Sequence, residues 1–225
     1  MAAFAAAVAM GYRYVETDVH ATSDGVLLAF HDHTLDRVTD MTGDVAALPY
    51  RDVRNARVGG EPIARFDELL EAWPGLRIHV DAKHPAAAAP LVATVDRAGA
   101  HDRVCVGSFT DATVRAMRRL GGDRLCTWMG RVEILGMRLA SWGLPLPRPV
   151  AACTQAPVRQ GRLPIVDRRF VAEAHRRGVG VHVWTINERP EMERLLDLGV
   201  DAILSDRPTL LKQVFADRGL WIEGQ

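Results

Sequence analysis

The chain has 225 residues, of which 48% are hydrophobic and 25% are charged, and its formal net charge is zero. This length suits one α/β domain, and the composition is that of an ordinary soluble globular protein. The balanced charge gives no electrostatic case for binding nucleic acid or an anionic membrane, so any function must depend on local charge.

The chain begins with an apolar segment, residues 1–10, that has no basic start and no clear cleavage site. We therefore predict a buried helix that ends at Gly11, rather than a signal peptide. No later run approaches the ~18 apolar residues of a membrane-spanning helix. The three cysteines, Cys105, Cys126 and Cys153, are too far apart to suggest a disulfide framework or a zinc site, and are expected to be core residues.

Short β-rich runs then alternate with helical stretches, which is typical of β-α units around a parallel sheet. Strands are expected at residues 12–19, 26–31, 76–81, 104–107, 125–129, 151–156, 179–185 and 202–204. Helices are expected at residues 66–73, 86–98, 111–120, 167–177 and 190–198. Residues 34–62 are expected to be an ordered excursion over one end of a barrel, and residues 142–149 a loop. We predict one domain spanning residues 1–225.

Polar side chains recur where the expected strands end. In a parallel barrel these ends lie on one rim, where active sites form. The residues concerned are Asp18, His31, Asp81, Ser108, Thr185 and Asp206.

Glu16 and Asp18 are two residues apart on a strand, so both side chains point to the same face. Two inward carboxylates repel each other unless a positive charge neutralises them. Hard oxygen ligands favour Mg²⁺ or Ca²⁺ over zinc. The alternative is that both face solvent or form salt bridges with Arg13 or a lysine.

Asp81 and Lys83 repeat this spacing with opposite charges. Asp81 can complete a metal site of three carboxylates, and Lys83 can place a positive charge beside an anionic substrate. The alternative is that the two residues only neutralise each other. His31 is followed by Asp32, and histidine is a residue type that suits proton transfer, although a structural role is also open.

Near the end of the chain, Trp184 and Asn187 close the strand at residues 179–185. Trp184 can stack against a ligand and Asn187 can bind it by hydrogen bonds. A core tryptophan and a helix N-cap are the alternatives.

Taken together, these segments resemble the glycerophosphodiester phosphodiesterase family. The resemblance rests on motifs at residues 11–19, 22–25, 31–32, 80–83, 108–109, 184–187 and 205–208, together with Thr39. It implies a (β/α)8 TIM barrel of the phospholipase-C-like phosphodiesterase type, which cleaves glycerophosphodiesters to sn-glycerol 3-phosphate and an alcohol.

The same resemblance implies a role for each matching residue. Glu16, Asp18 and Asp81 correspond to ligands of a divalent metal, Mg²⁺ or Ca²⁺. His31 and Lys83 correspond to catalytic residues. The substrate-binding residues are Trp184, Asn187 and Ser108.

The family pattern also opens with a strand that ends His-Arg-Gly, which this chain does not contain. We therefore expect the first barrel strand to be missing and activity to be impaired. A cytoplasmic location is expected, with a lost signal peptide left open. The expected partner is a small glycerophosphodiester, with no nucleic acid and no transmembrane segment. Lysophospholipase D-type activity and a catalytically inactive phosphodiester-binding module are the alternatives.

Overall fold

The computed structural model describes residues 1–222. The chain divides into two compact units, Met1–Cys126 (unit 1) and Thr127–Gln225 (unit 2). The expected single domain stays a prediction.

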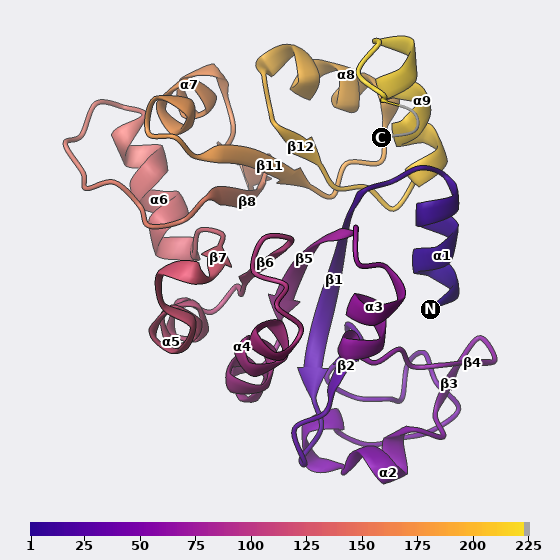
Figure 1. Ribbon diagram of the computed structural model, residues 1–225. Coiled ribbons are helices and arrows are strands. Elements are labelled where there is room, and N and C mark those ends of the chain that lie inside the picture. Colours follow the sequence, from indigo (N-terminus) through magenta and orange to yellow (C-terminus); the bar gives the residue numbers. More distant parts are fainter. Residues whose placement is uncertain (223–225) are drawn as a thin grey trace. The chain divides into compact units, whose positions relative to one another are not determined.

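Unit 1 is built on a five-stranded sheet with the order β2-β1-β5-β6-β7 (Figure 1). Its strands are β1 (Tyr14–Ala21), β2 (Leu27–Ala29), β5 (Arg77–Ala82), β6 (Val104–Gly107) and β7 (Cys126–Thr127), in which the chain passes into unit 2. β5 pairs in parallel with β1 and with β6. β2 instead runs antiparallel to β1. The expected strand at residues 26–31 is therefore not part of the parallel series, because a short turn can only return the chain antiparallel.

The alternation of side chains along β1 and β5 separates an apolar face from a polar one. Val19, Val80 and Ala82 belong to a buried cluster with side chains of the helices. Those helices are α3 (Phe66–Ala72), α4 (Ala88–Arg97) and α5 (Asp111–Gly121). The intervening residues, Asp18 and Asp81 among them, therefore point to the opposite face of the sheet.

The first helix, α1 (Ala2–Ala9), confirms the expected helix, but the expected burial is wrong. None of its residues is buried. Only Phe4 and Val8 pack against the cluster beside α3, and the Phe4 ring lies 6.5 Å from the ring of Trp73. An alanine-rich helix offers few large side chains, so two contacts anchor it.

The excursion after β2 is ordered, as expected. It contains short elements, namely η1 (Val45–Ala47), α2 (Tyr50–Val53), β3 (Arg57–Val58) and β4 (Glu61–Pro62). Its own small core includes Leu35, Val45, Val53 and Ala56. Whether it covers one end of a barrel stays a prediction.

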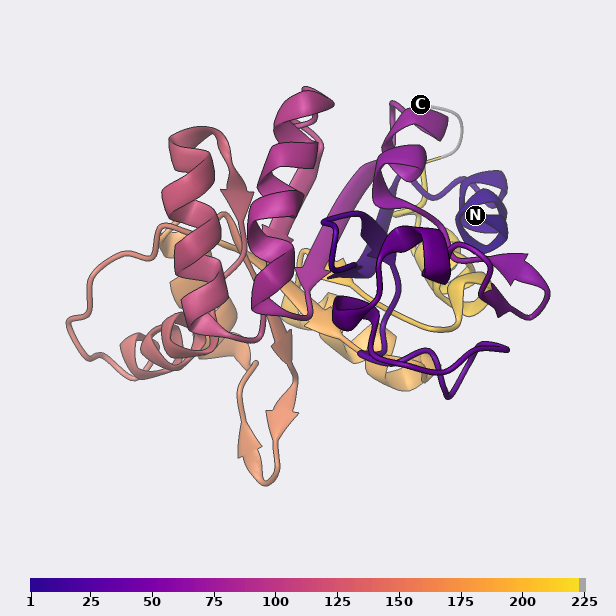
Figure 2. The same cartoon turned by 90° about the horizontal axis from the view of Figure 1, so that it is seen from below.

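Unit 2 contains a parallel sheet with the order β12-β11-β8. Its strands are β8 (Cys153–Pro157), β11 (Gly180–Trp184) and β12 (Ala202–Ile203). Its helices are α6 (Arg131–Ala140), α7 (Arg168–Arg176), α8 (Arg189–Leu198) and α9 (Pro208–Asp217). Two features of unit 2 were not predicted: α6, and the hairpin of β9 (Arg159–Gln160) and β10 (Leu163–Pro164) that projects from this unit in Figure 2.

Within residues 1–222, none of the three cysteines forms a disulfide bond. Cys105 and Cys153 are buried, as expected of core residues, whereas Cys126 is half-buried. Within residues 1–222, no helix has the length and apolar character needed to cross a membrane.

Candidate active site

The polar face of unit 1 brings together three of the residues that the sequence singled out. In the parallel pairing of β1 with β5, Asp18 lies opposite Asp81. Lys83 follows β5, and its Nζ lies 2.8 Å from Asp18 Oδ1 and 2.9 Å from Asp81 Oδ2. One ammonium group therefore bridges two carboxylates from neighbouring strands.

This cluster is only partly neutralised. Asp81 is 2% exposed, and burial raises the pKa of its carboxyl group against the opposing effect of Lys83. Burial alone lowers the pKa of Lys83, but Asp18 and Asp81 together outweigh it, so the net shift is upward. Lys83 thus stays charged. Asp81 Oδ1 has no hydrogen-bond partner among the described residues, which leaves a buried oxygen available to a cation.

Glu16 lies further from this centre than the sequence suggested. It is exposed, and on the neighbouring strand it lies opposite His79, two residues before Asp81. Among the described residues, no three carboxylates have oxygens that all lie within 4.8 Å of one another. Glu16, Asp18 and Asp81 therefore do not form a compact group of three carboxylates. Two carboxylates are therefore gathered at Lys83, and the third stands at the edge.

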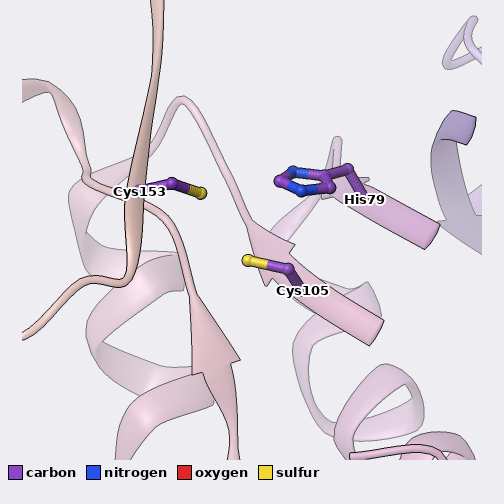
Figure 3. A group of neighbouring side chains, drawn as sticks. All are labelled: His79, Cys105 and Cys153. Atoms are coloured by element: carbon purple, nitrogen blue, oxygen red, sulfur yellow. The ribbon is translucent and has the colours of Figure 1, made fainter. Parts of the chain in front are cut away.

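His79 has a second neighbour within unit 1. It lies opposite Cys105 in the parallel pairing of β5 with β6, and both side chains are directed to the same side of the sheet (Figure 3). The polar face therefore continues onto β6. This neighbourhood of His79 cannot be predicted from the sequence, because the register between strands cannot be deduced from spacing along one strand.

His31 belongs to a hydrogen-bonded chain of three side chains. Its Nδ1 lies 2.8 Å from Asp32 Oδ1, and Arg37 donates to both Asp32 oxygens at 2.6 and 2.9 Å. Hydrogen bonds from Arg37 and then His31 hold the pKa of Asp32 well below its usual range. Asp32 is thus an ionised acceptor for Nδ1–H, which leaves Nε2 of the exposed His31 as the proton-accepting nitrogen.

The backbone places His31 beside β1. The Phe30 amide donates to Asp18 O at 2.9 Å, which continues the β1–β2 hairpin. His20 Nε2, from the buried end of β1, lies 3.1 Å from His31 O. The antiparallel hairpin therefore brings the segment of His31 alongside Asp18, although β2 is not a parallel strand.

Ser108 and Phe109 follow β6. Ser108 is buried, and its hydroxyl donates to Ala82 O at 2.7 Å and accepts from the Thr110 amide at 3.2 Å. These bonds fix the segment after β5, where Lys83 lies. The Phe109 ring is 43% exposed, and its centroid lies 5.5 Å from Lys83 Nζ. The sequence analysis did not select Phe109 as a site residue, although it directly follows Ser108.

Trp184 and Asn187 lie in unit 2. Trp184 ends β11 and is half-buried. Asn187 Oδ1 accepts from Ser205 Oγ at 3.0 Å and from the Asp206 amide at 2.9 Å, while its Nδ2 donates to Asp206 Oδ2 at 3.0 Å. Asn187 therefore joins the segments that follow β11 and β12. This explains its presence at a strand end in structural terms, and its substrate-binding role stays a prediction.

Comparisons with known proteins identify the family of this chain. A model of the glycerophosphoryl diester phosphodiesterase family matches residues 1–210. A protein of Mycobacterium tuberculosis named "Probable glycerophosphodiester phosphodiesterase 2" is 38% identical over 231 residues, with 98% of this chain and 86% of the relative covered.

Two solved structures show the same fold. A glycerophosphodiester phosphodiesterase from Agrobacterium tumefaciens superposes with a TM-score of 0.78 at 22% identity, over 96% of this chain and 91% of that one. An Oleispira antarctica phosphodiesterase in complex with the product sn-glycerol-3-phosphate superposes with a TM-score of 0.77 at 19% identity, over 96% and 90%.

The chain belongs to the glycerophosphoryl diester phosphodiesterase family. This membership confirms the resemblance seen in the sequence and the enzyme class that it implied, a phosphoric diester hydrolase. The structural neighbours confirm the fold class, an α/β fold of the (β/α)8 barrel type.

Proposed function

We propose that the chain hydrolyses glycerophosphodiesters to sn-glycerol 3-phosphate and an alcohol, with Lys83, His31 and a divalent cation at its active site. The observation that carries this proposal is the ammonium of Lys83 held between Asp18 and Asp81, at 2.8 and 2.9 Å. Such a centre combines a fixed positive charge with carboxylate oxygens, which suits the binding of a phosphodiester.

The residues of unit 1 fit a hard divalent cation. All the candidate donors are carboxylate oxygens, the class that Mg²⁺ and Ca²⁺ prefer. Two carboxylates meet one ammonium, and a buried oxygen of Asp81 has no hydrogen-bond partner among the described residues. Asp18 and Asp81 would hold the cation, with Glu16 at the edge of the site. When bound, it would neutralise charge on the phosphoryl oxygens.

The side chains of the chain itself divide the remaining work. Lys83 supplies a positive charge to the phosphoryl oxygens that does not depend on the cation. His31 accepts a proton from the attacking oxygen at Nε2, because Nδ1 is occupied by Asp32. Ser108 keeps the segment of Lys83 in place through Ala82 O. Trp184 and Asn187 remain candidates for contacts to the substrate.

A product assay tests this proposal. Purified protein is incubated with glycerophosphocholine and Mg²⁺, Ca²⁺ or EDTA, and released sn-glycerol 3-phosphate is measured enzymatically. We expect release with at least one cation, none with EDTA, and a strong reduction in Lys83→Met. Release that is unchanged in EDTA and in Lys83→Met would contradict the proposed centre.

Two alternatives are distinguished by choline release and by binding measurements. Lysophospholipase D-type activity would release choline from lysophosphatidylcholine faster than from glycerophosphocholine. An inactive binding module would bind glycerophosphocholine in calorimetry, with affinity retained in His31→Ala and no product under any cation.

A cytoplasmic location is part of the proposal, and fractionation of the native cells tests it.

A further inference from the structure

The charge of this chain is balanced overall but not locally. Residues 131–169 contain seven arginines, no lysine and two acidic residues, although the whole chain has 28 basic and 28 acidic residues. Arg138 pairs with Asp167. The other six are exposed, and no ion pair among the described residues includes them. These arginines are Arg131, Arg148, Arg159, Arg162, Arg168 and Arg169.

The same region exposes a line of large apolar side chains along α6. Val132 is 65% exposed and Leu135 is 55% exposed, and their spacing of three places them side by side on the helix. The next position in this line, Arg138, is covered by Trp142, whose ring centroid lies 4.5 Å from Arg138 Cζ. Trp142 is itself 47% exposed, so the apolar line extends beyond the end of the helix.

Two arginines hold this arrangement in place. Arg138 is 3% exposed and anchors α6 to Asp167 at the start of α7, at 2.7 Å. Arg177 Nη1 donates to Leu146 O and Pro147 O, both at 2.9 Å, and so ties down the proline-rich segment after Trp142. Trp142 therefore lies between two segments that these arginines hold in place, and the guanidinium of Arg138 packs against its ring.

We propose that this region of unit 2 binds the surface of an anionic lipid bilayer. The α6 face, defined here by Arg131, Val132, Leu135 and Trp142, would insert its apolar side chains at the level of the lipid headgroups. Amphipathic helices with arginines beside leucine and tryptophan bind in this way. The remaining arginines of residues 131–169 would contact lipid phosphates, including those of the projecting β9–β10 hairpin (Figure 2).

Other occupants fit these side chains less well. A second copy placed symmetrically on the α6 face would bring like charges together, because the region has few acidic residues to pair with. A nucleic acid would match the arginines, but the apolar line offers it only one aromatic ring for stacking. An anionic bilayer satisfies both features. The zero net charge gave no case for binding an anionic membrane, because it averages this arginine-rich region with the rest of the chain.

Vesicle flotation tests the proposal without any need for turnover. The full chain is mixed with vesicles of phosphatidylcholine alone, or with one third phosphatidylglycerol, in 0.1 M NaCl. We expect flotation only with the anionic vesicles and its loss as NaCl is raised. Absence of flotation with anionic vesicles overturns the proposal. Binding to a single-stranded RNA without binding to vesicles also overturns it and identifies a nucleic-acid surface instead.

Matched variants locate the contact. Arg148→Gln/Arg162→Gln removes two charges, and since one arginine near an anionic membrane contributes roughly fivefold in affinity, a loss of about 25-fold is expected. Arg115→Gln/Arg119→Gln on α5 of unit 1 removes the same charge and should retain binding. Val132→Ser/Leu135→Ser should weaken binding, whereas Val58→Ser/Leu120→Ser, at exposed positions of unit 1, should not. Equal losses in test and control variants would refute the assignment to unit 2.

Quenching of tryptophan fluorescence by brominated lipids gives a second measurement. Trp142 is the tryptophan of the α6 face, and Trp142→Phe keeps an aromatic ring over Arg138. We expect quenching in the wild-type chain that is largely lost in Trp142→Phe, with flotation retained. Quenching that is unchanged in Trp142→Phe would show that the membrane contact does not involve the α6 face.

Discussion

Lys83 forms ion pairs with both Asp18 and Asp81, which come from neighbouring parallel strands. The three side chains constitute a small charged cluster in which one cation faces two anions. Because Asp81 is buried, removal of the positive charge beside these two carboxylates would lower the stability of the fold. This relationship accounts for the first two predictions.

Replacing Lys83 with Met should separate catalysis from fold stability. We expect kcat to fall by roughly 10²-fold or more, because a charge at the phosphoryl group is lost. The free energy of unfolding in EDTA should fall by about 2–3 kcal/mol, because two carboxylates lose their partner. Steady-state kinetics and urea unfolding check both. Lys212→Met removes the half-buried lysine of α9, which lies over the ring of Trp221, and serves as the control; an equal effect there would contradict the prediction.

Replacing Asp81 with Asn should remove the response to divalent cations. In the wild-type chain, we expect the melting temperature to rise with added Mg²⁺ or Ca²⁺, because ligands that bind the folded state stabilise it. This rise should be absent in Asp81→Asn. In EDTA the melting temperature should change little, because without a cation the buried carboxylate of Asp81 contributes little to the stability of the folded state. Differential scanning fluorimetry checks this. An undiminished rise in Asp81→Asn would place the cation elsewhere.

Arg37 and Asp32 should act on catalysis through His31. Asp32 fixes the ring nitrogen that carries the proton, and Arg37 fixes Asp32 with two hydrogen bonds. We expect Asp32→Asn and Arg37→Gln to lower kcat roughly 10- to 100-fold with little change in KM. His31→Ala should lower it about 10²- to 10⁴-fold. Arg51→Gln, at an exposed position of α2, is the control. A change confined to KM would indicate substrate binding instead.

The stability of unit 2 should depend on pH through Glu173. Hydrogen bonds from Arg176 and Arg177 lower the pKa of Glu173 from 4.5 to about 2. A carboxyl group with a lowered pKa stabilises the folded state above pH 4.5, and this contribution is lost as the pH falls toward 2. The melting temperature of Glu173→Gln should therefore lie below that of the wild type at pH 7, and the two should converge below pH 4.5. Glu61 is exposed and forms no ion pair within residues 1–222, so Glu61→Gln should show no such convergence.

Gly121 at the end of α5 should tolerate no side chain. A Cβ atom at this position would lie 2.7 Å from the Cβ and Cδ2 atoms of Leu125, which is buried. We expect Gly121→Ala to lower the free energy of unfolding by about 1–3 kcal/mol, as overpacking does. Gly75→Ala is the matched control, because nothing lies within 4 Å of a Cβ there. Urea unfolding of both variants checks the prediction, and equal stability would contradict it.

The sequence was sufficient for the family, the alternation of strands and helices, and several of the candidate site residues. Glu16, Asp18, Asp81 and Lys83 could be selected because the period of two along a strand shows which side chains share a face. The strand at residues 104–107 was predicted with the bounds that β6 has. In contrast, α6 was missed, because Gly136 interrupts it and only part of its apolar residues are buried: Met137 and Ala140 are buried, whereas Val132 and Leu135 are exposed.

Only the tertiary structure decided how these residues meet. The spacing of Asp18 along its own strand says nothing about a partner some 60 residues later, because register depends on the packing of whole strands. The pairing of β1 with β5 places Asp18 opposite Asp81 and Glu16 opposite His79, so two carboxylates face each other across the strands and the third lies two residues further along β1. The hairpin likewise brings His31 beside Asp18 through a backbone hydrogen bond. The sequence thus determined which groups are available, and long-range strand pairing determined which of them lie together.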